Sequence, residues 1–241
     1  MPLEELLLVR HGESVGNVAA TAAELAGAEV IALDVRDADV PLSETGVDQA
    51  RALATRLREA DPIPQVAWVS PYVRAQQTFA LATAAGPALT AVVSDERLRD
   101  RELGILDLLT RRGVAARHPD EMERRAHLGK YYHRPPGGES WADVSLRLRS
   151  FLRDAAETPA DVGLVVAHDA VVMLLVALLL RWDEAALLEF ASRNTVLNAS
   201  VTTLRRSGAE WELADFSDVR HLQREGAEVT VHPGSPDVEP E

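Results

Sequence analysis

Residues 6–12 read Leu6-Leu7-Leu8-Val9-Arg10-His11-Gly12, an apolar run followed at once by a cation, an imidazole and a glycine. A short apolar run of this kind is typical of a buried strand. The triplet then lies at the carboxyl end of the strand, where open α/β sheets bind their ligands. There, a neutral imidazole can attack phosphorus, a guanidinium can hold phosphate oxygens, and glycine lets the backbone approach a ligand. An isolated Arg-His pair is more often a solvated loop, so its meaning depends on partners elsewhere in the chain.

Length and composition are those of an ordinary globular protein, with 241 residues, 46% hydrophobic and 26% charged. The formal net charge of −13, without a dense basic block, argues against a nucleic-acid partner. Cysteine is absent, which excludes disulfides and thiolate chemistry. The first five residues carry no basic group, so no signal peptide is expected.

One apolar stretch, residues 162–180, could be mistaken for a membrane span, but His168-Asp169 divides it into pieces too short to cross a bilayer. We therefore expect a cytoplasmic enzyme with no membrane partner. The sequence does not determine the oligomeric state, and a homodimer is compatible with it.

Short apolar runs alternate with amphipathic segments along most of the chain. We expect strands over Glu4–Val9, Gln65–Ser70, Leu89–Val93, Val162–Ala167, Ser200–Arg205 and Trp211–Phe216. Helices are expected after Ser43 or Thr45, after Ser140, and over Ala170–Leu180, which is apolar all round. This alternation predicts an α/β fold with a largely parallel central sheet and helices on both faces, closed by an antiparallel hairpin.

A single domain is expected over residues 1–224, followed by an acidic, loose tail over 225–241 that contains proline and glycine. Two stretches do not fit the alternation. Val15–Asp39 is rich in alanine and weakly patterned, and Asp107–Pro136 is rich in arginine. Both are expected to lie over the strand ends as a lid, and some cations of the second are expected to contact substrate. The alternative for that second stretch is a solvated helical pair.

Other strand ends also carry side chains suited to phosphate binding or proton transfer. Arg74 lies in the first turn after the strand that ends at Ser70, where a helix N-terminus and an arginine together make an anion site. His168 directly follows the fourth strand, and Asp100 and Glu102 follow the third. Each residue alone has an ordinary structural explanation, but their occurrence at four strand ends predicts one phosphate-handling site.

These motifs resemble the histidine phosphatase superfamily, which has the phosphoglycerate-mutase-like fold. The resemblance rests on Leu8–Ser14 with Asn17, on Ser70-Pro71 with Arg74 and Thr78, and on His168, and it spans Leu6 to about Phe216. Asp39–Gly46 is similar to the family's segment before its second helix, and Pro136–Ser140 to the fructose-2,6-bisphosphatase and phosphatase branches. The resemblance implies a phosphoglycerate-mutase-like sheet with a helical lid insertion.

The family's functional residues match positions in this chain. The resemblance implies that His11 is the nucleophile and becomes phosphohistidine. Arg10, Arg74 and His168 would then surround the transferred phosphoryl group, and Asn17 would form a hydrogen bond with it. Two guanidiniums and an imidazolium can neutralise a phosphoryl dianion, so no metal is expected.

The proton donor departs from the family's pattern. The family usually has a glutamate four residues before a glycine at the third strand end; Gly104 marks that register, and Asp100 occupies the position. Aspartate is shorter by one methylene but can transfer a proton in the same way. Glu102 is the second candidate. Asp169 is the third, because some distant members use an aspartate directly after the second histidine.

Phosphatases and mutases of this family differ in whether water or a second phosphorylated substrate accepts the phosphoryl group. The segment Gly137-Gly138-Glu139-Ser140 resembles phosphatase-type members more closely, so the resemblance implies a phosphatase of small phosphorylated metabolites, without naming the substrate. The first alternative is a phosphoglycerate mutase, which would need 2,3-bisphosphoglycerate; otherwise no cofactor is expected. The second is a catalytically weak, regulatory domain that binds a phospho-ligand, against which the complete set of histidines and arginines argues.

Overall fold

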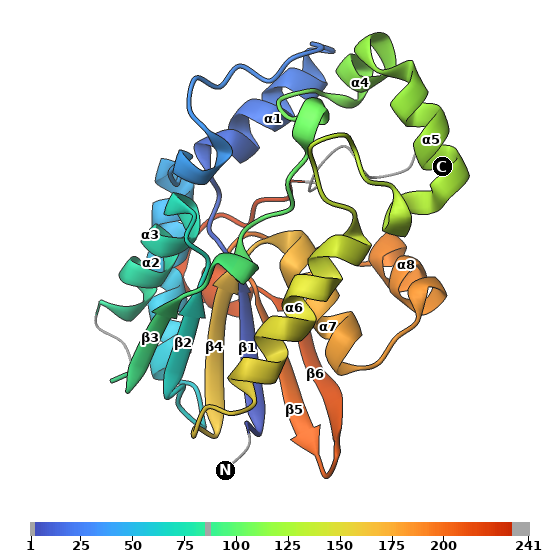
Figure 1. Cartoon of the computed structure of the whole chain (residues 1–241). Helices are drawn as coiled ribbons and strands as arrows, with labels where there is room; N and C mark the ends of the chain where they lie inside the picture. The colour runs from blue at the N-terminus through green and yellow to red at the C-terminus, as the bar shows by residue number, and fades with distance from the viewer. Residues whose placement is uncertain (1–2, 85–87, 233–241) are drawn as a thin grey trace.

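The computed structural model describes residues 3–84 and 88–232. Within them, one sheet has the strand order β3-β2-β4-β1-β5-β6 (Figure 1). The first four strands along the chain are parallel, while β5 is antiparallel to β1 and β6 is antiparallel to β5. Their bounds are β1 Glu5–Arg10, β2 Val66–Val69, β3 Ala91–Ser94, β4 Val162–Ala167, β5 Val201–Ser207 and β6 Glu210–Asp218. The predicted α/β fold and its terminal hairpin are confirmed, with small shifts at strand ends.

Helices connect these strands and cover them. Their bounds are α1 Val15–Leu25, α2 Glu44–Arg58, α3 Val73–Thr83, α4 Arg111–Arg117, α5 Pro119–Tyr132, α6 Trp141–Ala155, α7 Asp169–Leu179, α8 Glu184–Arg193 and α9 Arg220–Glu225. Ser43 caps α2 and Ser140 caps α6, each accepting a hydrogen bond from a backbone N–H of the first turn, as predicted from the sequence. Helix α7 is central, with seven consecutive buried residues from Val171 to Ala177.

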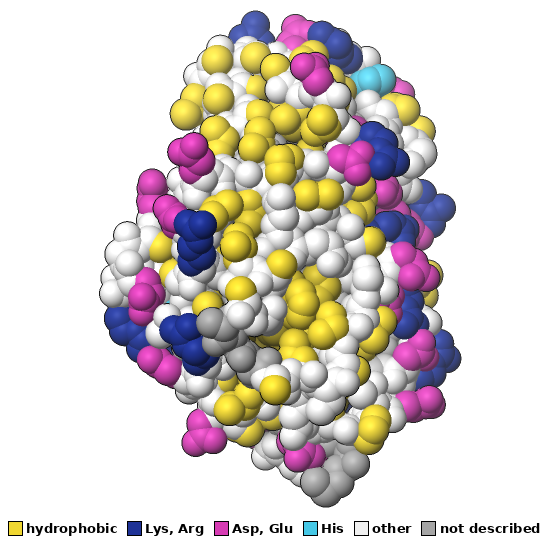
Figure 2. Space-filling model, turned by 90° about the vertical axis from the view of Figure 1, so that its left-hand side faces the viewer, with side chains coloured by type: hydrophobic (Ala, Val, Ile, Leu, Met, Phe, Trp, Pro, Cys, Tyr) yellow, Lys and Arg dark blue, Asp and Glu magenta, His cyan; other side chains and the backbone are white. Residues whose placement is uncertain are grey.

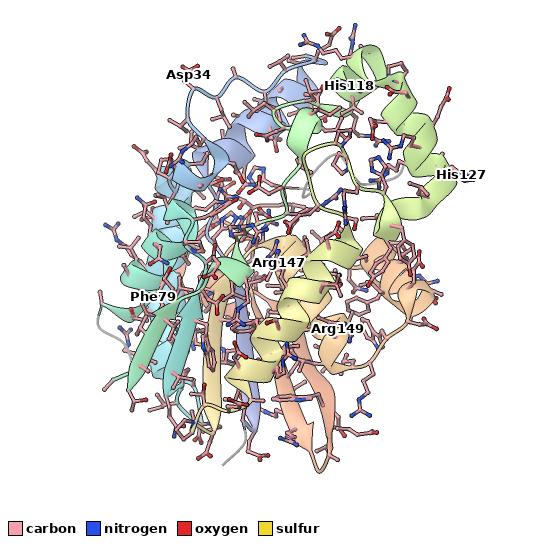
Figure 3. All side chains as sticks on the ribbon, viewed as in Figure 1. Asp34, Phe79, His118, His127, Arg147 and Arg149 are labelled. Atoms are coloured by element: carbon pink, nitrogen blue, oxygen red, sulfur yellow. The ribbon has the colours of Figure 1, made fainter. Side chains whose placement is uncertain are left out.

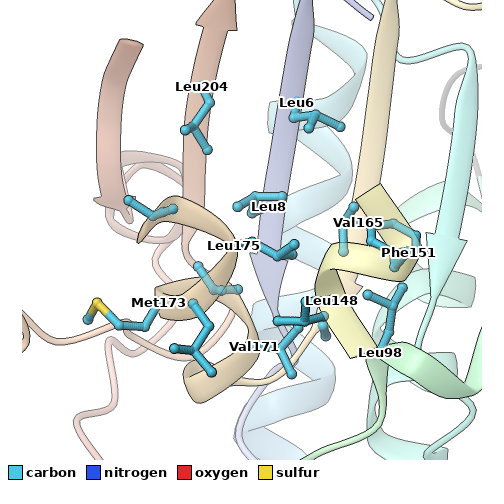
Figure 4. Packing of buried hydrophobic residues seen from close by; sticks show 14 of the residues in the cluster. Leu6, Leu8, Leu98, Leu148, Phe151, Val165, Val171, Met173, Leu175 and Leu204 are labelled. Atoms are coloured by element: carbon cyan, nitrogen blue, oxygen red, sulfur yellow. The ribbon is translucent and has the colours of Figure 1, made fainter. Parts of the chain in front are cut away.

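The core lies on both faces of the sheet, because successive side chains of a strand point to opposite sides. Leu6 and Leu8 of β1 pack against α6 and α7 (Figure 4). Leu7 and Val9 pack on the other face, against α2 and α3. All residues of β1 and β4 are buried, which explains why these strands appear in the sequence as continuous apolar runs.

The two stretches that break the alternation form a lid together. Helices α1, α4 and α5 lie beyond the carboxyl ends of the parallel strands (Figure 1). The loop after α1 is held to the second stretch by hydrogen bonds from Ile31 N to Leu108 O (2.8 Å) and from Thr110 Oγ1 to Ala28 O (2.6 Å). The predicted helical lid insertion is therefore present above the strand ends.

The described part of the tail that we expected to be loose is held against the domain. Gln49 Nε2 of α2 donates to Glu228 O and to Thr230 Oγ1, both at 2.9 Å. Thr230 and His232 are buried. The expectation of a loose tail is therefore corrected for residues 226–232, because long-range hydrogen bonds that composition does not reveal hold this segment; residues 233–241 lie outside the described residues.

The surface mixes apolar and charged side chains. Strand β3 forms one edge of the sheet, and all four of its residues are exposed. Figure 2 shows this side of the molecule, where hydrophobic side chains lie in the middle of the face and charged ones gather toward its edges. No helix within the described ranges is long and apolar enough to span a membrane.

Candidate active site

His11 directly follows β1, in a loop whose backbone is held from two sides. His11 N donates to Ala167 O, and Gly12 N donates to Thr78 Oγ1 of α3, both at 3.0 Å. A Cβ atom on Gly12 would lie 2.6 Å from Gly46 O at the start of α2, so only glycine permits this close approach. The packing of α2 and α3 thus places a buried imidazole at the carboxyl end of the sheet.

Two contacts determine the tautomer of His11. Its Nδ1 lies 2.6 Å from Gly12 O, which can only accept, so Nδ1 carries the hydrogen. Its Nε2 lies 3.2 Å from Nε of Arg74, which can only donate, so Nε2 carries a lone pair. Burial lowers the pKa of His11 well below 6.5, and the charges of Arg74, His168 and Arg10 lower it further. A neutral imidazole with its lone pair on Nε2 is the nucleophilic form.

Arg10, the last residue of β1, is a buried cation. Its Nη1 donates to Val196 O at 2.6 Å and to His232 O at 3.3 Å. Its Nε is also buried and has no hydrogen-bond partner among the described residues. Such a donor is costly to leave unpaired, so Arg10 Nε is a ready contact for an anion.

Arg74 lies in the first turn of α3, as the sequence predicted, and connects three parts of the site. Its Nε donates to His11 Nε2, and its Nη2 lies 3.0 Å from Asp100 Oδ2. Its Nη1 lies 2.9 Å from Asp37 Oδ1 and donates to Asp37 O at 2.6 Å. The guanidinium therefore joins the nucleophile, the segment after β3 and the lid loop.

His168 follows β4 and is fully buried. Its Nε2 lies 2.8 Å from Ser70 Oγ, and its Nδ1 lies 3.3 Å from Asp100 Oδ2, off the direction of a hydrogen bond. The rings of His168 and His11 are 5.2 Å apart. Burial by itself raises the pKa of Asp100, but His168 and Arg74 hold that pKa well below its usual range. Asp100 is therefore ionised in this arrangement.

The segment that carries Asp100 is fixed by α6 and by the Pro136 turn. Arg147 of α6 (Figure 3) donates from Nη2 to Asp100 O at 3.1 Å and to Glu139 Oε2 at 3.0 Å. Gly104 has φ +57°, and a Cβ there would lie 2.1 Å from Pro136 O. Only glycine satisfies both constraints, so this glycine holds the segment in place.

Asn17 lies in the first turn of α1, close to the histidine loop. Its Oδ1 accepts from Ser14 N at 3.1 Å and from Asn198 Nδ2 at 3.3 Å. Because these contacts use the oxygen, the amide Nδ2 is the group that can donate to a ligand.

The two alternative proton donors contact other groups. Glu102 is exposed and accepts from the Tyr72 hydroxyl at 3.0 Å. Asp169 begins α7, and its Oδ1 accepts from Ala170 N at 2.6 Å. Of the three candidates, the structure brings Asp100 into contact with both Arg74 and His168.

Sequence reasoning assigned no role to Asp37, which contacts Arg74, or to Ser70, which contacts His168. Ser70 belongs to the Ser-Pro motif and directly follows β2, so the sequence did contain a signal that this residue lies at the site. Asp37 lies in the weakly patterned stretch after α1, and only the folded lid reveals its contact.

Cations of the arginine-rich stretch, some of which we expected to contact substrate, pair within the lid and its neighbours. The pairs are Arg117 with Glu29 (3.1 Å), Arg124 with Glu121 (2.7 Å), Arg134 with Asp143, and Lys130 over the ring of Trp141 (4.5 Å). Pairing with neighbouring groups therefore accounts for the contacts of these four cations in the structure. No group of three or more His, Asp or Glu side chains within the described part of the chain is arranged to hold a metal ion.

Comparison with known proteins identifies the family and relatives of this chain. The family model of the histidine phosphatase superfamily (branch 1) matches residues 6–219. A metal-independent phosphoserine phosphatase of Arabidopsis thaliana is 29% identical over 223 residues, covering 92% of this chain and 84% of the relative. A probable phosphoglycerate mutase of Yersinia enterocolitica is 31% identical over 225 residues, which cover 90% of this chain and 94% of the relative.

Solved structures give the same fold. A mycobacterial glucosyl-3-phosphoglycerate phosphatase bound to VO3 superposes with a TM-score of 0.68 at 28% identity, covering 90% of this chain and all (100%) of that chain. A putative alpha-ribazole-5'-P phosphatase from Escherichia coli superposes with a TM-score of 0.72 at 22% identity, covering 90% of this chain and 97% of that chain. At this identity the likeness shows the fold alone.

The charges around His11 predict that its ring stays neutral at pH 6.5, because burial and the neighbouring cations disfavour the imidazolium. Histidine ring NMR across pH 4 to 8 tests this, with the exposed His127 (Figure 3) as the internal reference. The Arg74→Gln variant should raise the pKa of His11, since removing a nearby positive charge favours protonation. A His11 ring that titrates at or above pH 6.5 in the unaltered protein would contradict the assignment.

Proposed function

The chain belongs to branch 1 of the histidine phosphatase superfamily, and we propose that within it this protein is a metal-independent phosphatase of small phosphorylated metabolites. The observation that carries the proposal is the buried, neutral His11, whose Nε2 lone pair faces the Arg74 guanidinium, together with the buried Nε of Arg10, which has no hydrogen-bond partner among the described residues. A phosphoryl group needs such positioning and charge neutralisation more than covalent help from the protein.

In the first proposed step, Nε2 of His11 attacks phosphorus, and an N–P bond forms as the P–O bond to the alcohol breaks. Arg10, Arg74, His168 and the Asn17 amide hold the phosphoryl oxygens, where the negative charge lies in the transition state. Arg10, Arg74 and His168 are already buried at this edge of the sheet, and the phosphoryl group replaces the carboxylates that Arg74 holds before it binds.

Asp100 is the proposed proton donor to the leaving oxygen. Its pKa is low because Arg74 and His168 face it. When a phosphoryl dianion binds to Arg74 and His168, these two groups stabilise the Asp100 carboxylate less, and the pKa of Asp100 rises. Asp100 then holds a proton and gives it to the departing alkoxide, which leaves as the neutral alcohol.

In the second proposed step, water attacks the phosphohistidine and the N–P bond breaks. Asp100, now ionised, accepts a proton from that water, so phosphate is released and neutral His11 is restored. Each step is a substitution at phosphorus in which the same carboxyl group first gives and then takes a proton.

A phosphatase is favoured over a mutase by what surrounds the site. A mutase must hold a second anionic substrate while it excludes water, and four cations of the lid insertion are paired with neighbouring groups instead. The phosphoglycerate mutase reaction stays the alternative because of the Yersinia relative. A weak regulatory binding domain is less favoured, since the nucleophile, both guanidiniums and an acid lie together. The cytoplasmic location and the homodimer remain predictions.

We expect the protein to release phosphate from phosphomonoesters in the presence of EDTA, because the proposed phosphate-binding groups are cationic or neutral and suit no divalent cation. The measurement is phosphate release from nitrophenyl phosphate and a panel of phosphorylated metabolites, with and without EDTA. Interconversion of phosphoglycerates that requires 2,3-bisphosphoglycerate and outpaces phosphate release would show a mutase. Activity that EDTA abolishes and magnesium restores would contradict metal independence.

The Asp100→Asn variant should slow phosphorylation of His11 by alkyl phosphates about a hundredfold or more, because general acid help is worth about two to four powers of ten. Nitrophenyl phosphate should be affected much less, since its leaving group needs little protonation. Single-turnover kinetics with both substrate types measure the contrast.

The matched controls for that experiment are Glu102→Gln and Asp169→Asn, because each removes a nearby carboxylate that could take the role. Both should keep the wild-type dependence on the leaving group. If Glu102→Gln shows the loss and Asp100→Asn does not, Glu102 is the acid and the register taken from Gly104 is wrong.

A further inference from the structure

Carboxylates lie immediately outside the buried cations. Asp100 and Asp37 contact Arg74 at 3.0 and 2.9 Å, and their side chains are 24% and 44% exposed whereas that of Arg74 is 5% exposed. Glu102, which is exposed, accepts from the hydroxyl of Tyr72, whose ring centre lies 5.0 Å from the Arg74 guanidinium carbon. We call Asp37, Asp100 and Glu102 the acidic rim. The buried side of the site therefore carries positive charge, and the more exposed acidic rim carries negative charge.

Cations near the acidic rim are engaged by other acids. Arg36 of the lid loop lies 2.6 Å from Asp39. Arg99 and Arg147 lie 2.8 and 2.9 Å from Glu139. These guanidiniums are thus neutralised by their ion pairs. The charge near a ligand bound at the acidic rim therefore comes mainly from the carboxylates of the rim.

Binding of a phosphoryl group would release the Asp37 carboxylate. Both groups use the Nη atoms of Arg74, so a phosphoryl dianion takes the place that the carboxylate holds at 2.9 Å. If the phosphoryl group binds these buried cations, the alcohol part of a phosphomonoester would extend toward the exposed side, where the Asp37 side chain is 44% exposed. An ammonium group there restores an ion pair, whereas a carboxylate there adds a like charge.

The pKa of Asp107 also reflects the negative charge of the acidic rim. Burial raises the pKa of Asp107, and the charge of Asp37 raises it further, followed by a smaller effect of Glu102. Like charges therefore already repel one another at this edge of the site before a substrate arrives.

We propose that Asp37 determines substrate specificity: it favours phosphomonoesters whose alcohol part carries an ammonium group and disfavours those that carry a carboxylate, such as phosphoglycerates. The proposal rests on the phosphatase function given above and narrows its substrate class. The carboxylate first holds Arg74 in place and then, once displaced by the phosphoryl group, pairs with the ammonium group of the substrate.

Three substrates of similar size test the proposal: phosphoethanolamine, 2-hydroxyethyl phosphate and phosphoglycolate, which carry an ammonium, a hydroxyl and a carboxylate at the same place. We expect kcat/KM to fall in that order, by about tenfold per unit of charge for groups a few ångströms apart at the protein surface. The Asp37→Asn variant should reduce the ratio of kcat/KM for phosphoethanolamine to that for phosphoglycolate by about a hundredfold, because these two substrates differ by two units of charge at that place. Comparing one ratio between proteins cancels the intrinsic reactivity of each leaving group.

Asp34→Asn is the matched control, since Asp34 is an exposed acid of the same loop at the outer edge of the molecule (Figure 3). It should leave the ratio unchanged. Nitrophenyl phosphate, which lacks a charged substituent beside the ester, reports the phosphatase function separately and should be hydrolysed by all three proteins.

The outcomes separate the two proposals. If nitrophenyl phosphate is hydrolysed but Asp37→Asn keeps the wild-type ratio, the specificity role is overturned and the phosphatase function stands. If no monoester is hydrolysed, the phosphatase function fails, and binding of 2-aminoethylphosphonate against 3-phosphonopropionate by calorimetry still decides the role of Asp37. Equal affinities of the wild-type protein for these two ligands would then overturn it.

Discussion

Burial of positive charge at one edge of the sheet is the constraint on which the rest of this structure depends. Arg10 and Arg74 are almost fully enclosed, next to two buried imidazoles. A buried cation is tolerated only when other groups pair with it. Arg10 donates hydrogen bonds to backbone carbonyls, and Arg74 forms ion pairs with carboxylates. One donor of Arg10, its Nε, has no hydrogen-bond partner among the described residues. The same concentration of charge keeps His11 neutral and Asp100 ionised before a substrate binds, and in the proposed first step Asp100 gains a proton once the phosphoryl group contacts Arg74 and His168.

The topology of the sheet explains why residues so far apart in the chain meet here. Strands β1, β4 and β2 are adjacent and parallel, so the residues that follow them, His11, His168 and Ser70, emerge at the same edge. Arg74 comes one helical turn later. Asp100 needs a longer connection, and the α6 guanidinium of Arg147 holds that connection in place.

Much of this could be predicted from the sequence, for physical reasons. Strands buried on both faces leave unbroken apolar runs, and serine caps mark helix starts, so both were located closely. Contacts of high sequence separation leave no local pattern. Asp37, which meets Arg74 from the lid, and His232, whose carbonyl accepts from Arg10, could not be found this way. A run of cations in the sequence does not show which acids pair with them, and Arg117 of the lid pairs with Glu29, which is far from it in the sequence.

The central claim is that His11 carries the phosphoryl group during turnover, and direct detection of that species tests it best. The protein is mixed with labelled nitrophenyl phosphate, quenched in alkali on the millisecond scale, and its phosphorylated residue is mapped by mass spectrometry. The account predicts an acid-labile phosphate on His11 that forms and decays at least as fast as the steady-state turnover. Phosphate on another residue, or a complete turnover in which His11 is never phosphorylated, would contradict it.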